Sequence, residues 1–395
     1  MLPTPEPTAV ATVVVPGTDA GPASDAGPAG RLARLARDVR PNWFASVMGT
    51  GILANASAQL PWQPPGLRAA ATVVWALAAL LLVGLVVLWC AHVVRHPAMA
   101  RSYHLDPVMA HFYGAPPMAL LTVGAGTLAL GSAVIGARVA VAADAVLWAT
   151  GTALGLAAAV AVPYLQFTRH TVADDAAFGG WLMPIVPPMV SAATGAALVP
   201  HVPAGQPRLT MLLACYAMFG LSLVATLVVL PQLWGRLARH KVGAAAMVPT
   251  LWIVLGPLGQ STTAVNLLGA QAPVVVADER WSWLLGALGI AYGVPVLGFI
   301  LLWLGIAGAV TVRTVRAGMP FAPTWWSFTF PVGVTVTGIS ALAVHTGSVA
   351  LRGLAVIWWV GLLLAWLVVA TRSVRAGVRR PAPVVVRPGG EPRTW

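Results

Sequence analysis

The chain has 395 residues, of which 58% are hydrophobic and 9% are charged, and its mean hydropathy is +0.82. A soluble domain carries about 25% charged residues, so this composition excludes a water-soluble globule and, for most of the chain, intrinsic disorder. The net charge of +12 comes from Lys and Arg clusters between long apolar runs. This arrangement is typical of a membrane protein, and we expect no nucleic-acid partner.

Ten apolar segments are each predicted to cross the membrane as a helix, which takes about 20 residues. We therefore expect an all-α polytopic membrane domain over residues 41–373, in contact with membrane lipid. Residues 1–40, which end in a basic stretch, and the basic residues 374–395 are predicted to be disordered cytoplasmic tails. The predicted spans are 42–60, 69–94, 108–131, 140–166, 178–199, 207–233, 246–269, 282–312, 324–346 and 352–373.

The Lys and Arg residues support this count of spans. With ten crossings, 18 of the 23 Lys and Arg residues fall on one side of the membrane and 5 on the other. The positive-inside rule then places both termini in the cytoplasm. We expect the protein to lie in the plasma membrane.

An aromatic residue opens every odd-numbered span, which indicates an internal repeat. Trp43, Phe112, Trp181, Trp252 and Trp325 are separated by 69, 69, 71 and 73 residues. A repeat of this length holds two membrane helices. The sequence therefore predicts five helical hairpins in series, all in the same orientation.

The odd spans also carry predicted helix breaks. A broken helix leaves unpaired backbone groups, which survive in a membrane only where protein or a water-filled cavity surrounds them. We therefore predict that the five odd helices line a central pore and that the even helices face lipid, although Gly and Pro are common in membrane helices generally. The predicted breaks are Gly49, Gly51, Pro116, Pro117, Pro187, Pro188, Gly256, Pro257, Pro331 and Gly333.

Most of the intramembrane hydroxyl and amide groups also lie in the odd spans. Acidic residues avoid the span centres, and Asp144 lies near the outer end of its span, which argues against a cation transporter. Donor groups and the positive ends of half-helix dipoles favour an anion path, although a path for neutral solutes would look similar. We expect no metal site, cofactor or catalytic residue. The predicted substrate contacts are Thr50, Asn55, Ser191, Thr194, Gln260, Ser261 and Thr335.

Three stretches carry a family resemblance: PNWFASVMGTGIL (41–53), LWIVLGPLGQ (251–260) and WWSFTFPVG (325–333). They resemble motifs of the tellurite-resistance/dicarboxylate transporter family. That family includes tellurite-resistance proteins, fungal malate permeases, fungal sulfite exporters and plant slow anion channels. The resemblance covers roughly residues 40–373, and its first and last motifs look closer to the malate-permease and sulfite-exporter branches than to the plant channels.

The resemblance implies five hairpins around a pore, a homotrimer with one pore in each subunit, and a phenylalanine gate on the ninth helix. The matching position is Phe330, because Phe328 lies about 200° away around a helix and cannot also point inward.

Transport of small anions is therefore the expected function, with C4-dicarboxylates such as malate as the first candidate. A passive channel or exporter for inorganic anions such as sulfite, tellurite, chloride or nitrate is the alternative. A membrane-embedded enzyme or sensor would require a titratable cluster facing the pore.

Overall fold

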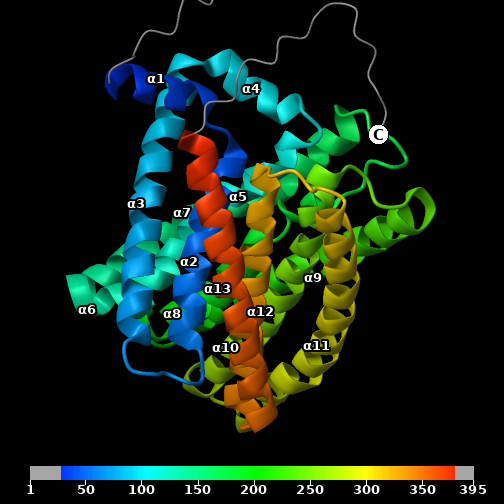
Figure 1. Cartoon of the computed structure of the whole chain (residues 1–395). Helices are drawn as coiled ribbons and strands as arrows, with labels where there is room; N and C mark the ends of the chain where they lie inside the picture. The colour runs from blue at the N-terminus through cyan, green and yellow to red at the C-terminus, as the bar shows by residue number, and fades with distance from the viewer. Residues whose placement is uncertain (1–27, 379–395) are drawn as a thin grey trace, which may run out of the picture.

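A computed structural model describes residues 28–378, and within that range the chain is helical and contains no strand (Figure 1). The predicted all-α fold is therefore confirmed for this part of the chain. Seven helical segments in the same range are long and apolar enough to cross a membrane. They are Leu67–Arg95, Met109–Ile135, Ala137–Thr168, Gln206–His240, Glu279–Arg316, Pro323–Thr346 and Val349–Ala376.

Three further helices occupy the other predicted spans, but they are too short or too polar to be counted among these seven segments. Helices α2 (Phe44–Gln59) and α8 (Pro187–Leu198) have 16 and 12 residues, and α10 (Leu255–Val275) contains several amide and hydroxyl side chains. Length and composition therefore support seven crossings, and the ten-span topology stays a prediction.

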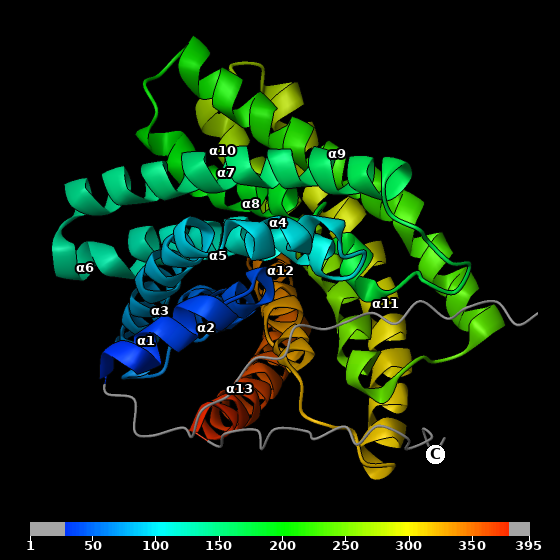
Figure 2. The ribbon, with the colours of Figure 1, turned by 90° about the horizontal axis from the view of Figure 1, so that it is seen from above.

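Five helices form a closed inner ring, in which each helix packs against the next and the last packs against the first (Figure 2). Five longer helices surround this ring, and each covers the seam between two neighbouring inner helices. The inner helices, in order around the ring, are α2, α5 (Ala115–Gly126), α8, α10 and α12 (Phe330–Thr346). The outer helices are α3 (Leu67–Arg95), α7 (Ala137–Thr168), α9 (Gln206–His240), α11 (Glu279–Arg316) and α13 (Val349–Val378).

Inner and outer helices differ sharply in burial. The apolar window of the segment that contains α12 is 83% buried, whereas the corresponding windows of α3, α7 and α13 are each 22% buried. Because lipid accepts an apolar surface without penalty, the outer helices can be rich in Ala, Leu and Val on their exposed faces. The inner helices carry the polar side chains because protein surrounds them on all sides.

A short 3-10 helix precedes each inner α-helix in the chain. The prolines predicted to break the helices lie at these junctions: Pro116, Pro187 and Pro331 each fall in the first turn of an α-helix. A proline there loses no hydrogen bond and starts a helix instead of breaking it. The 3-10 helices are η1 (Pro41–Trp43), η2 (Met109–Gly114), η4 (Gly179–Leu182), η6 (Ala245–Val254) and η7 (Pro323–Phe328).

The predicted break at Gly49 and Gly51 is wrong, because residues 44–59 form one continuous helix. These glycines serve close packing instead. A Cβ on Gly49 would lie 2.7 Å from the Trp326 ring, and a Cβ on Gly51 would lie 2.8 Å from Thr122 Cγ2. Both distances are too short for a side chain, so glycine lets the inner helices approach each other.

The predicted amino-terminal tail also needs a correction. Residues Pro28–Asp38, assigned to a disordered segment, form the amphipathic helix α1, which packs on α3. The carbonyl of Ala36 lies 3.0 Å from Nδ1 of the buried His92. At the other end, α13 continues through residue 378, into the predicted tail. The remaining tail residues, 1–27 and 379–395, lie outside the described range. Helix α1, α4 (Pro97–Leu105) and the end of α13 lie at the same end of the molecule (Figure 1).

Candidate functional site

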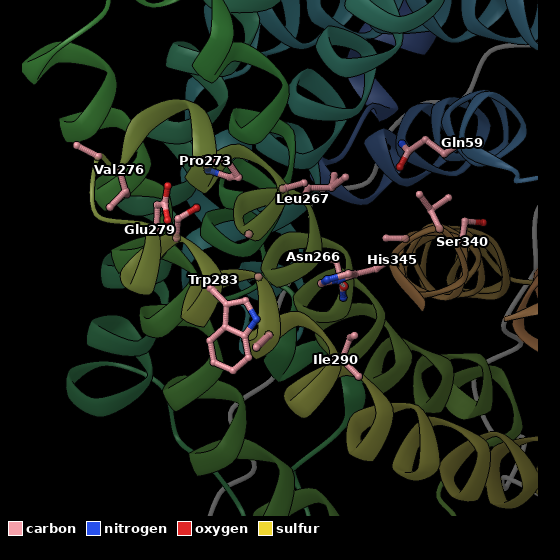
Figure 3. Close-up of a pocket in the computed structure, with 18 residues that line it drawn as sticks. Gln59, Asn266, Leu267, Pro273, Val276, Glu279, Trp283, Ile290, Ser340 and His345 are labelled. Atoms are coloured by element: carbon pink, nitrogen blue, oxygen red, sulfur yellow. Dashed lines mark hydrogen bonds between the residues drawn. The ribbon is translucent and has the colours of Figure 1, made fainter. Parts of the chain in front are cut away.

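Three cavities follow one another along the inner ring. The largest, which we call the vestibule, has a volume of about 1060 Å³ and lies between α10, α11 and α12, with Gln59 of α2 at its edge (Figure 3). Its lining includes Asn266 and His345, whose Oδ1 and Nδ1 atoms lie 2.8 Å apart. Glu279 is its acidic residue.

The second cavity, which we call the central chamber, has a volume of about 280 Å³. It shares Gln59 and Leu267 with the vestibule, so the two spaces adjoin. All five inner helices contribute to its wall. The polar residues of the wall are Asn55, Gln59, Thr122, Thr194, Gln260, Thr263 and Thr337.

A third space, the small cavity of about 30 Å³, lies among the junctions between 3-10 and α-helices. It also touches all five inner segments, through residues such as Met48, Met118, Val186, Gly256 and Pro331. A volume of about 30 Å³ is that of a single water molecule in the liquid. The ring is therefore nearly closed at this level.

Phe330 is the one residue, within the described range, that lines both the central chamber and the small cavity. It is 3% exposed and is the first residue of α12. Phe328, two residues earlier, instead packs edge-on against Trp252 and Trp325 and lines neither cavity. Phe330 thus lies between the two spaces.

The central chamber and the small cavity have uncharged linings, without Asp, Glu, Lys, Arg or His among their described residues. The five inner α-helices begin at Phe44, Ala115, Pro187, Leu255 and Phe330. Each of these residues lines the small cavity or lies close in sequence to a residue that does. The start of an α-helix carries partial positive charge. Backbone dipoles, and not charged side chains, are therefore the nearby source of positive potential.

The amide of Gln260 is the chamber group best placed to donate a hydrogen bond to a solute. Its side chain is 4% exposed, lines the chamber and has no protein hydrogen-bond partner in the described part of the chain. The hydroxyls of Thr122, Thr194 and Thr263 instead donate to carbonyls of their own helices. The Asn55 amide donates to the carbonyl of Thr122, at 3.0 Å.

Four of the predicted substrate contacts lie outside the chamber wall. Thr50 accepts a hydrogen bond from Trp366 of α13 (3.1 Å), Ser191 from Thr152 of α7 (2.9 Å), and Ser261 from Tyr292 of α11 (2.8 Å). Thr335 donates to the Pro331 carbonyl (2.9 Å). The first three hydroxyls therefore join inner helices to outer ones, which leaves Asn55, Thr194 and Gln260 of the predicted set on the wall.

Of the predicted breaks, Gly256 and Pro331 line the small cavity, while Pro117 and Pro187 pack against Gly155 of α7 and Gly333 packs against Ile52. Pro188 and Pro257 are buried within the first turns of α8 and α10. The predicted substrate contacts missed four polar wall residues: Gln59, Thr122, Thr263 and Thr337. No motif marks them, and only the packing of the inner helices places them at the chamber.

A helical ring that encloses a polar chamber, inside a shell of apolar helices, is the architecture of a membrane transporter or channel. The chain belongs to the voltage-dependent anion channel (SLAC1) family, which it matches over residues 38–374. It is thus a multi-pass membrane protein from a family of anion transporters and channels.

Named relatives extend over most of the chain. The sulfite efflux pump SSU1 of Trichophyton rubrum is 30% identical, over 76% of this chain and 81% of its own length. That of Arthroderma otae is 28% identical, over 85% of this chain and 89% of its own length. An uncharacterized transporter of Methanocaldococcus jannaschii is 25% identical, over 84% of this chain and 91% of its own length.

Proposed function

We propose that this protein moves small anions across the membrane through the inner ring, and that Phe330 is the gate. The observation that carries this proposal is the position of Phe330, which lines both the central chamber and the small cavity. In this proposal all ten segments cross the membrane. A solute then passes from the vestibule through the chamber when the ring of Phe330 moves aside.

The electrostatics of the path support an anion as the solute. Helix N-termini around the small cavity favour negative charge, and Gln260, Asn55 and Thr194 offer polar contacts in the chamber. A buried cation would bind an anion tightly and slow its release. An uncharged wall is therefore consistent with modest affinity and fast passage.

Sulfite, as a small inorganic anion, is the first candidate substrate. The named fungal relatives are sulfite efflux pumps, and the described lining of the chamber contains no cationic side chain to pair with the two carboxylates of a diacid. A C4-dicarboxylate such as malate is the second candidate, because a chamber of about 280 Å³ is roomy enough for a four-carbon diacid.

Flux measurements with the purified full chain in proteoliposomes test this choice. We expect sulfite to cross faster than malate, because near neutral pH much of it is the hydrogen sulfite monoanion, which gives up less hydration energy in an uncharged chamber than a dianion does. The measurement is efflux of each labelled anion from vesicles of identical protein content. Faster passage of malate would favour the second candidate, and the absence of flux with every anion would contradict the proposed function.

A fixed negative charge in the chamber is expected to block the path. Gln260→Glu places a carboxylate on the wall and should lower sulfite flux about tenfold, since like charges repel strongly where water is scarce. The matched control is Gln232→Glu on the exposed face of α9, which should leave flux unchanged. Equal flux in the two variants would show that Gln260 does not face the path.

We further propose a homotrimer in the plasma membrane, with one path in each subunit and both termini in the cytoplasm. The trimer follows from the family resemblance, and the orientation follows from the excess of Lys and Arg on one side of the predicted topology. The transport unit is residues 41–373, with the tails outside the membrane. Labelling of a cysteine introduced beside Arg95 or beside Arg138, from each side of the membrane, tests the orientation.

A further inference from the structure

A buried carboxyl group lies beside the chamber wall but outside the chamber. Asp144 of α7 is 1% exposed, and neither of its carboxyl oxygens has a hydrogen-bond partner among the described residues. The sequence places it near the end of a span, where water or lipid headgroups could reach it. The structure instead encloses it between helices, where a negative charge without a partner is costly.

The carboxyl group packs directly on the backbone of α5. A Cβ on Gly124 would lie 2.5 Å from Asp144 Oδ1 and 3.1 Å from Leu147 Cβ. Only glycine leaves room for the carboxyl at this point. Helix α5 therefore presents Gly124 to Asp144, while Thr122 and Ala125 of the same helix face the chamber.

The backbone just beyond Gly124 is irregular. Residues Thr127–Gly131 form a π-helix turn (η3), a feature frequent at functional sites, and Leu128 and Ala129 of this turn line the chamber. Arg68 of α3 donates to the Ala129 carbonyl at 2.7 Å. The segment next to Asp144 is thus part of the chamber wall.

Few other charged groups can balance Asp144. The elements packed on this part of α7, which are α5, η3, α6 (Ser132–Ile135) and α8, carry no titratable side chain in the described structure. On α7 itself, Arg138 is exposed, six residues earlier. Elements η2 and α4 also contact α7, but near its opposite end, where Nε2 of His170 lies 2.8 Å from the His104 carbonyl. Their titratable residues are His111, Tyr113, Arg101, Tyr103 and His104.

We propose that Asp144 is a proton-binding site whose charge state sets how readily the central chamber holds an anion. A helix is about 10 Å across, so an ionised Asp144 repels an anion in the chamber through one layer of low-dielectric protein. Protonation removes this repulsion. Because such coupling is reciprocal, an anion in the chamber also promotes proton uptake at Asp144. This inference rests on the proposed anion path.

Nitrate flux through the reconstituted full chain, measured between about pH 5 and pH 8, tests the proposal. Nitrate does not titrate in this range, so any pH dependence belongs to the protein. We expect the nitrate flux of the wild type to fall several-fold as the pH rises. The Asp144→Asn variant should instead keep, over the whole pH range, the flux that the wild type shows at low pH. Asp174→Asn, the same change at an exposed position, should keep the wild-type profile. A wild-type profile in Asp144→Asn overturns the proposal.

Infrared difference spectroscopy gives a second test, and its first measurement needs only the wild type. Adding nitrate should increase the carbonyl band of a protonated carboxylic acid, and this band should be missing in Asp144→Asn. The absence of any nitrate-sensitive carboxyl band across the pH range overturns the proposal. Flux that is present but independent of pH overturns only this inference, whereas an absence of flux with every anion overturns the proposed function as well.

Discussion

Replacing Phe330 with alanine is expected to raise anion flux about tenfold, which corresponds to a barrier lower by about 1.4 kcal/mol. The physical reason is that Phe330 lines both the central chamber and the small cavity and is the proposed gate between them. Truncation to a methyl group joins these two spaces. The measurement is sulfite or nitrate flux in proteoliposomes, normalised to the amount of correctly inserted protein.

The matched control for this change is Phe299→Ala on the outer helix α11. Phe299 stacks on Trp303, 6.3 Å away between ring centroids, and lines none of the three cavities. Its loss should leave flux at the wild-type level. If Phe330→Ala, folded and inserted, carries no more anion than Phe299→Ala, then the gate is at another position.

Replacing Gly259 with alanine is expected to cause a large loss of stability, about 3 kcal/mol. A Cβ on Gly259 of α10 would lie 2.7 Å from the backbone nitrogen of Thr335 and 2.8 Å from its Cα, so α10 and α12 would have to separate. Overpacking against backbone has no flexible side chain to relieve it. We expect a markedly lower Tm in detergent and loss of flux, because α10 and α12 both form the chamber wall.

The control for Gly259 is Gly220→Ala on the outer helix α9, where nothing lies within 4 Å of an added Cβ. This change should be neutral or slightly stabilising, since alanine is the better helix former by about 1 kcal/mol. A similar Tm for the two variants would mean that the close crossing of α10 and α12 does not limit stability. Tryptophan fluorescence follows both unfolding curves.

Hydroxyl groups illustrate the limit of prediction from the sequence. Thr50 and Thr194 both lie in predicted pore helices, and no local pattern distinguishes them. In the structure Thr194 lines the chamber, whereas Thr50 accepts a hydrogen bond from Trp366, 316 residues away in the chain. The direction of each side chain depends on which outer helix covers that face of the inner helix. This information is non-local and is missing from any single segment.

The prolines show a related limit. Their positions indicate interrupted helices, and α-helices do begin at or beside Pro116, Pro187 and Pro331, each after a 3-10 helix or a short turn. The sequence does not reveal that these residues begin α-helices near the small cavity. That placement depends on the stacking of five separate segments around one axis.

The sequence by itself determined the all-helical membrane character of the chain, because composition and span-length hydropathy are local properties that the bilayer enforces directly. Its motifs also identified the family and singled out Phe330. Only the tertiary structure decided which polar groups face the chamber and that Asp144 is enclosed without a hydrogen-bond partner among the described residues. The reason is that burial in a helical bundle depends on contacts between segments far apart in the chain, such as Gly124 against Asp144.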